Sequence, residues 1–228
     1  MKRGILVPLV ALVMATLVGC SQPQKPVKVV MKTNMGKIEM VLYDQTPAHR
    51  DNFVKLAEEH YFDGLLFHRV IEGFMIQGGD PDSRNAAPGQ LLGNGGPDYT
   101  VEAEIRTPEI FHKRGVLAAA REGNDVNPER RSSASQFYIV WGEVQTPESL
   151  ERVSSRAERL FGEPLHFTPE QVEAYTTIGG TPHLDGEYTI FGEVTKGLEV
   201  VEAIQHLKTD RNDRPLADVR IKSVRVIR

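Results

Sequence analysis

From residue 29 onward the chain is dominated by short strand-like segments, and in several of them apolar and polar residues alternate. This period-two pattern is typical of strands that bury one face. Such segments occupy residues 29–33, 37–43, 67–70, 74–77, 115–121, 135–140, 189–194 and 219–226. In the last of them the alternation changes phase near Ser223, which predicts a β-bulge. Many short strands with few helices between them indicate a closed antiparallel barrel.

Two segments have apolar residues at helical spacing, and we expect them to cover the two ends of this barrel. In the first, Thr46 supplies the expected N-cap and Pro47 occupies the first helical position. The second follows Gly197, where Leu198 and Ile204 lie on one side of the predicted helix. The pattern therefore predicts a mainly β fold with two principal helices.

A further pair of helices is predicted within residues 144–178. The threonine–proline start signal recurs at residues 146–147 and 168–169. Thr168 and Gln171 also have the spacing of a capping box, in which each side chain bonds the other residue's backbone N–H. Because this pair interrupts the succession of strands, we interpret it as an insertion into the barrel.

The N-terminal residues have the pattern of an export signal. A basic pair at residues 2–3 precedes an apolar run at residues 4–18, which is too short for a spanning helix. The following Leu-Val-Gly-Cys resembles a bacterial lipobox, in which the cysteine, here Cys20, is lipidated and becomes the mature N-terminus. A plain secretory signal or a retained anchor is the alternative. The predicted organisation is a lipoprotein signal peptide at 1–19, a lipidated N-terminus and tether at 20–28, and a domain at 29–228 that contains the 144–178 insertion.

Composition and charge exclude several classes of partner. The 228 residues are 40% hydrophobic and 25% charged, as in a soluble globular domain. Loss of the two cations at residues 2–3 would take the formal charge from −4 to −6. No basic run remains that could follow phosphates, so nucleic acid is not an expected partner. The histidines show no H-E-x-x-H or H-x-x-x-H spacing, so neither a metal nor another cofactor is expected.

The residues that carry chemistry lie in one stretch, residues 67–80, with the sequence FHRVIEGFMIQGGD. Gly73 can turn the chain between two strands, because glycine accepts positive φ. The strands then place Arg69 and Gln77 on one face, beside apolar side chains, which is the usual composition of a small binding site. Strand alternation points His68 the other way, as a buried structural histidine. The competing interpretation is an ordinary buried hairpin whose arginine pairs with a carboxylate.

This stretch closely resembles the signature of the cyclophilin-type peptidyl-prolyl cis-trans isomerases, and the similarity extends over about residues 29–227, interrupted by residues 144–178. The resemblance implies an eight-stranded antiparallel barrel closed by a helix at each end. It also implies an isomerase that uses no cofactor, metal or covalent intermediate. By position in the family's motifs, the catalytic residue is Arg69. The substrate-binding positions are Phe74, Met75, Gln77, Ala120, Arg121, Tyr138, His183, Leu184 and Tyr188.

Three of these positions depart from the best-known members of the family. Arg121 stands where many eukaryotic forms have asparagine, and His183 stands where a tryptophan or phenylalanine lines the site. Tyr138 replaces the usual phenylalanine and adds a hydroxyl that needs a partner or solvent. None of these changes removes the arginine or the apolar pocket.

The leading hypothesis is a monomeric, lipid-anchored prolyl isomerase that acts on proline-containing segments of exported proteins. Its expected location is the cell envelope, facing the periplasm, where Ser21 after Cys20 is compatible with an outer membrane. A second hypothesis is a non-catalytic binder that holds proline-containing segments in the same groove, and a third is a structural envelope lipoprotein. The presence of Arg69 favours the enzyme, because a binder would not need that group.

Overall fold

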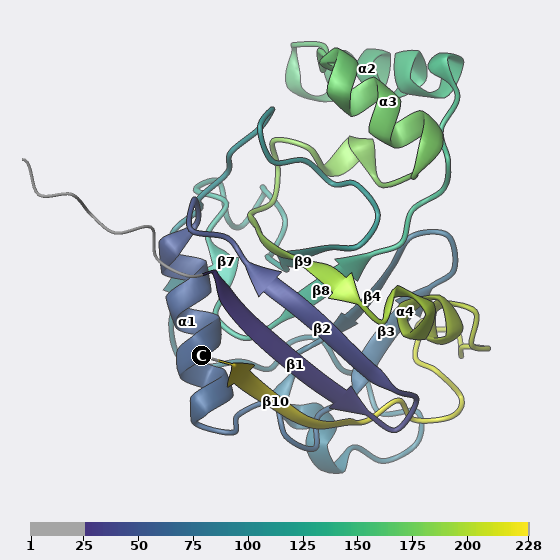
Figure 1. The fold of residues 1–228 in the computed structure, drawn as a ribbon. Coiled ribbons are helices and arrows are strands. Elements are labelled where there is room, and N and C mark those ends of the chain that lie inside the picture. Colours follow the sequence, from purple (N-terminus) through teal and green to yellow (C-terminus); the bar gives the residue numbers. More distant parts are fainter. Residues whose placement is uncertain (1–25, 228) are drawn as a thin grey trace, which may run out of the picture.

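A computed structural model describes residues 26–227, and its centre is a curled antiparallel sheet. The eight strands lie in the order β10-β1-β2-β9-β6-β8-β4-β3 (Figure 1). Their bounds are β1 (Val27–Thr33), β2 (Lys37–Leu42), β3 (Phe67–Ile71), β4 (Met75–Gly78), β6 (Val116–Ala119), β8 (Phe137–Val140), β9 (Ile190–Lys196) and β10 (Ile221–Ile227). Two short strands, β5 (Thr100–Val101) and β7 (Ser132–Ser133), form a separate pair that the alternation did not predict.

The sheet is curled but open, so the predicted closed barrel is wrong in this respect. Its edge strands are β3 and β10, and they meet only through an isolated bridge between Leu66 and Arg220. Both residues precede their strands, so the two edges touch at one corner instead of forming a continuous ladder. Hydrogen bonds around Ile221 hold this corner together, from its N–H to the Leu65 carbonyl at 2.8 Å and from the Gly64 N–H to its carbonyl at 2.7 Å.

Two helices cover opposite ends of the sheet, as the sequence predicted (Figure 1). Helix α1 (Pro47–Glu58) buries Phe53 and Leu56, and α4 (Leu198–Gln205) buries Val201 and Ile204. These side chains join the inward-facing residues of the strands in the main hydrophobic core. Complete burial of one such side chain contributes ~1.5–3 kcal/mol to the stability of the fold.

Helix α1 begins where the sequence predicts, with Thr46 at its N-cap, but the side-chain hydrogen bond of a capping threonine is absent. The Thr46 hydroxyl occupies the N-cap position and makes no hydrogen bond. The carboxylate of Glu104 accepts hydrogen bonds instead from the backbone N–H groups of Ala48, at 3.1 Å, and His49, at 3.0 Å. A negative charge at a helix N-terminus is favourable, since the first N–H groups have no partner within the helix.

The start and the end of the described domain also refine the prediction. Strand β1 begins at Val27, which pairs with Leu42, so residues 27 and 28 belong to the sheet and not to the expected tether. The bulge predicted near Ser223 is present, because the pairing of β1 with β10 shifts between Ser223 and Ile221. The predicted signal peptide and Cys20 lie outside the described residues. Within residues 26–227, no helix has the length and hydrophobicity needed to cross a membrane.

The predicted helical pair lies between β8 and β9 in the chain and stands apart from β1, β2 and β10 (Figure 1). It consists of α2 (Pro147–Phe161) and α3 (Pro169–Thr177). The capping box of Thr168 with Gln171 is confirmed, and Thr146 forms an equivalent box with Ser149. Helix α2 packs against both α3 and the short 3-10 helix η2 (Pro182–Leu184).

One buried carboxylate fastens this pair to the rest of the domain. Asp185, which is 2% exposed, accepts hydrogen bonds from the Tyr175 hydroxyl at 2.6 Å and from the Gln171 amide at 3.1 Å. Its other oxygen accepts from the backbone N–H of His112 at 2.8 Å and lies 2.9 Å from the Nδ1 atom of His112. A buried charge is tolerated only when its lone pairs are satisfied, and here four contacts satisfy them.

Replacing Tyr175 with phenylalanine should weaken this attachment, because Asp185 loses a donor while the ring keeps its packing. We expect the Tyr175→Phe variant to lose about 1–3 kcal/mol of unfolding free energy, measured by urea denaturation. The matched control is Tyr99→Phe, which removes the hydroxyl of a 41% exposed tyrosine that bonds Asn52 at 2.8 Å. That control should change stability by less than about 0.5 kcal/mol. Equal effects of the two substitutions would contradict the role of Asp185.

Candidate active site

One row of directly paired residues crosses four strands on the outer face of the sheet. Arg69 of β3 pairs with Gln77 of β4, Gln77 pairs with Tyr138 of β8, and Tyr138 pairs with Ala118 of β6. Residues opposite each other in antiparallel strands project to the same face, so register alone brings these side chains together. The sequence predicted the first two members from their strand positions and Tyr138 from the family resemblance, and the structure places all three side by side.

This row borders a cavity of about 160 Å³, which nine of the ten predicted site residues line. They are Arg69, Phe74, Met75, Gln77, Ala120, Arg121, Tyr138, Leu184 and Tyr188. The tenth, His183, does not line the cavity. Its ring stacks on Phe74, which lines the cavity, with the ring centres 5.6 Å apart and the planes at 26°.

Arg69 presents a partly free guanidinium at the edge of this cavity. Its side chain is 42% exposed. Its Nε atom lies 3.4 Å from an Asp213 carboxylate oxygen, and its Nη1 atom lies 3.4 Å from the side-chain oxygen, Oε1, of Gln77. Contacts of this length are weak, so the donors remain available to a bound molecule. The Gln77 amide group in turn donates to the Gln136 side chain at 3.1 Å, which fixes its orientation.

The hydroxyl of Tyr138 has the partner that the sequence required. It lies 3.0 Å from the Nε2 atom of His112, which is 1% exposed and also contacts Asp185. Burial raises the pKa of Tyr138 well above its usual range, so the phenol stays neutral and can donate. The sequence did not reveal His112 or Asp185, because an isolated histidine or aspartate has no pattern that predicts complete burial.

The guanidinium of Arg121 is engaged in contacts within the protein and is not free for a ligand. It donates to the Glu187 carbonyl and carboxylate, each at 2.8 Å, and stacks over the Tyr188 ring at 4.6 Å. The backbone of Ala120 is also occupied, by Gln136 at 2.9 Å and Ser133 at 2.8 Å. Within the described chain, no protein hydrogen bond uses the backbone N–H or C=O of Arg121. Of the two residues whose backbone was expected to bind the peptide, Arg121 is therefore the one whose backbone groups have no protein partner within the described chain.

His68 is buried, as predicted, but it does not simply point away from Arg69. The β3–β4 register shifts between Phe67 and Arg69, so His68 occupies a bulge that interrupts strand alternation. His68 and Arg69 consequently line one further cavity of about 260 Å³. Burial lowers the pKa of His68 to about 4, which leaves the ring uncharged near neutral pH.

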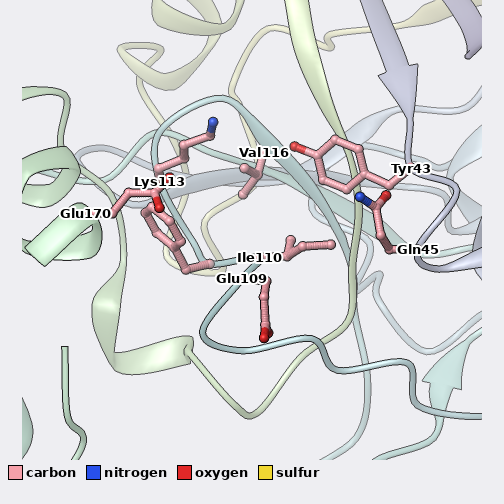
Figure 2. A pocket seen from close by; sticks show the side chains of 8 residues that line it. Tyr43, Gln45, Glu109, Ile110, Lys113, Val116 and Glu170 are labelled. Atoms are coloured by element: carbon pink, nitrogen blue, oxygen red, sulfur yellow. The ribbon is translucent and has the colours of Figure 1, made fainter. Parts of the chain in front are cut away.

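A separate cavity of about 170 Å³ contains none of the predicted site residues (Figure 2). Figure 2 shows Tyr43 and Ile110 at one side of it and Glu170 and Lys113 at the other. Lys113 is paired with Glu193 at 3.1 Å, and no arginine lines this space. Among residues 26–227 we also find no cluster of three or more histidine, cysteine, aspartate or glutamate side chains that could hold a metal ion.

Comparisons with known proteins agree with this geometry. Residues 28–226 match the family model described as "Cyclophilin type peptidyl-prolyl cis-trans isomerase/CLD". A Staphylococcus epidermidis protein named "Putative peptidyl-prolyl cis-trans isomerase" is 36% identical over 88% of this chain and 91% of its own length. A Staphylococcus aureus protein of the same name is 35% identical over 89% of this chain and 93% of its own length.

Solved structures lead to the same family. A cyclophilin-type peptidyl-prolyl cis-trans isomerase of Cryptosporidium parvum has 25% sequence identity and a TM-score of 0.62, and the match covers 90% of this chain and 99% of that one. A second structure of that isomerase, determined in the presence of the dipeptide Ala-Pro, matches with a TM-score of 0.60 and covers 88% and 99% of the two chains. The chain belongs to the cyclophilin-type peptidyl-prolyl cis-trans isomerases.

Proposed function

We propose that the protein accelerates rotation about X-Pro bonds in exported proteins and so assists their folding, with Arg69 as its catalytic residue. The observation that carries the proposal is the position of Arg69. Its weakly paired guanidinium borders an apolar cavity, in the same sheet row as Gln77 and Tyr138. Cavities with apolar walls and a few convergent polar groups are the usual form of small binding sites.

The apolar wall holds the proline ring while the rest of the peptide moves. Phe74, Met75, Tyr138 and Leu184 supply this wall, and Met75 and Tyr138 are almost completely buried. A ring fixed in this way leaves the preceding carbonyl free to rotate about the C–N bond. The free backbone groups of Arg121 and the oriented Gln77 amide hold the flanking peptide, so that the rotation is confined to one bond.

Arg69 lowers the barrier through hydrogen bonding to the amide nitrogen of proline. The barrier exists because partial double-bond character must be lost, and a nitrogen that accepts a hydrogen bond no longer conjugates with the carbonyl. Shortening a rotation of ~100 s to ~1 ms requires about 7 kcal/mol of preferential transition-state binding. A guanidinium is suited to this role, since it is permanently charged and offers donors in a fixed fork. No bond is made or broken, so no nucleophile is required.

The proposed location is the cell envelope, with the enzyme monomeric and held at the membrane by lipid on Cys20. The support is the sequence pattern around Cys20, together with the start of the family match at residue 28. The lipobox-like segment therefore precedes the isomerase domain instead of forming part of it. Several buried acyl chains give stable anchoring, since each CH₂ contributes ~0.8 kcal/mol. Proline-containing segments of proteins exported past the same membrane are the expected substrates.

The catalytic role is tested by substituting Arg69 and following the isomerisation of a short X-Pro peptide by the full chain. We expect Arg69→Ala to lower kcat/KM by about 10²–10³-fold, because the charged donor is lost. Arg69→Lys should fall between this variant and the wild type, since the charge remains and the fork is lost. The control is Arg131→Ala, which removes an arginine outside the cavity. Wild-type turnover by Arg69→Ala would contradict the mechanism, and binding without turnover in the wild type would favour a holding function.

The anchor is tested separately by expression in a bacterial host with radiolabelled palmitate. The wild-type chain should incorporate the label and sediment with membranes, whereas Cys20→Ser should do neither, because the serine offers no thiol for acylation. Label on the Cys20→Ser chain, or an unlabelled wild-type chain, would contradict lipidation at this cysteine.

A further inference from the structure

Helix α2 carries a row of arginines that the catalytic account does not use. Arg152, Arg156 and Arg159 are spaced at i, i+4 and i+7, so they lie along one side of the helix. All three are exposed, while Leu150 and Ala157 form the buried side of the same helix. We call these three arginines the basic row.

The arginines of the basic row make no hydrogen bond or ion pair within the described residues. A hydrogen bond from Thr146 is the main reason that the pKa of Glu148 is lowered, and the charge of Arg152, one turn further along α2, lowers it as well, although these two side chains are not within ion-pair distance. Two other arginines, of which Arg121 lines the cavity, differ in this respect. Arg121 and Arg130 share the Glu187 carboxylate, at 2.8 Å and 3.1 Å. The basic row therefore keeps its donors for a molecule that comes from outside.

The basic row adjoins the proposed proline site. Helix α2 packs on η2, the segment that carries His183 and Leu184. Desolvation by the surrounding protein lowers the pKa of His183, and His112 and then Arg156 lower it further, so Arg156 lies within electrostatic range of that ring. The ring of His183 stacks in turn on Phe74, a wall of the cavity. Helix α2 is therefore connected to the cavity wall through η2 and the His183 ring.

The position of the basic row is fixed by the buried contacts of the helical pair. Leu150 of α2 belongs to the same apolar cluster as Phe111, Ala174 and Tyr175. Tyr175 is bonded to Asp185, which contacts His112, the partner of the Tyr138 hydroxyl. The same chain of contacts that holds a wall of the cavity therefore holds the helix that carries the arginines.

We propose that the basic row selects proline-containing segments that carry acidic side chains a few residues from the proline. The inference rests on the proposed function and names the substrate class of that site. Guanidinium groups bind carboxylates through paired, charge-assisted hydrogen bonds, and three in a row can follow an acidic stretch in more than one register. The exposed Leu160 lies at the end of the row and offers one apolar contact to the same peptide.

An anionic lipid surface is the other macromolecular partner with this charge. The position of the basic row favours the peptide, because the row adjoins the cavity through His183 and Phe74. The experiment therefore includes vesicles as a separate arm.

The test measures kcat/KM of the full chain for three matched peptides that differ only in the residues flanking an Ala-Pro unit, which are glutamate, glutamine or lysine. Flanks are placed on either side of the unit. We expect the wild type to prefer the glutamate over the lysine peptide by about tenfold at low salt, the combined effect of a few exposed charge pairs, and to lose this preference at high salt.

The triple variant Arg152→Gln/Arg156→Gln/Arg159→Gln should reduce the ratio to about one. The triple lysine variant should keep most of it, and the control Glu151→Gln/Glu158→Gln, on another side of α2, should not reduce it.

Three other outcomes would contradict the proposed preference for acidic peptides, and each has a different consequence for the proposed function. If the wild type isomerises all peptides equally, the basic row does not select substrates, and the proposed function stands. If no peptide is isomerised, the proposed function and the inference both fail. If the triple glutamine variant keeps its peptide preference but loses binding to phosphatidylcholine–phosphatidylglycerol vesicles, the basic row is a membrane contact and the inference is wrong.

Discussion

The candidate site depends on one constraint, the register of four neighbouring strands. Direct pairing of Arg69 with Gln77 and of Gln77 with Tyr138 places a charged, an amide and an aromatic side chain in one line on the outer face. A shift of one residue in either pairing would send alternate side chains into the core. Glycine protects this register at Gly79, where a Cβ atom would come within 2.0 Å of the Ser135 carbonyl oxygen and where φ is +97°.

Two departures from the usual family pattern, Tyr138 and the inserted helical pair, belong to one connected network. The additional hydroxyl of Tyr138 contacts His112, which contacts Asp185, and Asp185 accepts hydrogen bonds from α3 of the helical pair. A phenylalanine at position 138 would leave the buried His112 nitrogen without this partner, at a cost of about 1–3 kcal/mol. The tyrosine at position 138 therefore has its hydroxyl partner in a buried network that also holds the inserted helices. This network connects the candidate site to the helical pair outside the sheet.

Local sequence was sufficient for the eight strands of the main sheet, the four α-helices that the structure describes and much of the candidate site, but it missed the β5–β7 pair and features that depend on distant partners. Alternation and the threonine–proline pairs located the strands and helices, and the contiguous stretch from Phe67 to Asp80 brought Arg69 and Gln77 together. The Glu104 cap on α1 and the burial of Asp185 could not be predicted, since each is created by residues far away in the chain. The open edge of the sheet was missed for the same reason, because closure depends on whether β3 and β10 overlap in space.

The most direct test of the central claim is exchange NMR on an Ala-Pro peptide mixed with a small amount of the isotope-labelled full chain. The same sample reports the rate of cis–trans exchange and the protein residues whose signals shift. The account predicts exchange far faster than the uncatalysed rotation of tens to hundreds of seconds, with shifts centred on Arg69, Gln77 and Tyr138. Slow exchange, or shifts centred on the cavity around Tyr43 and Glu170, would contradict it.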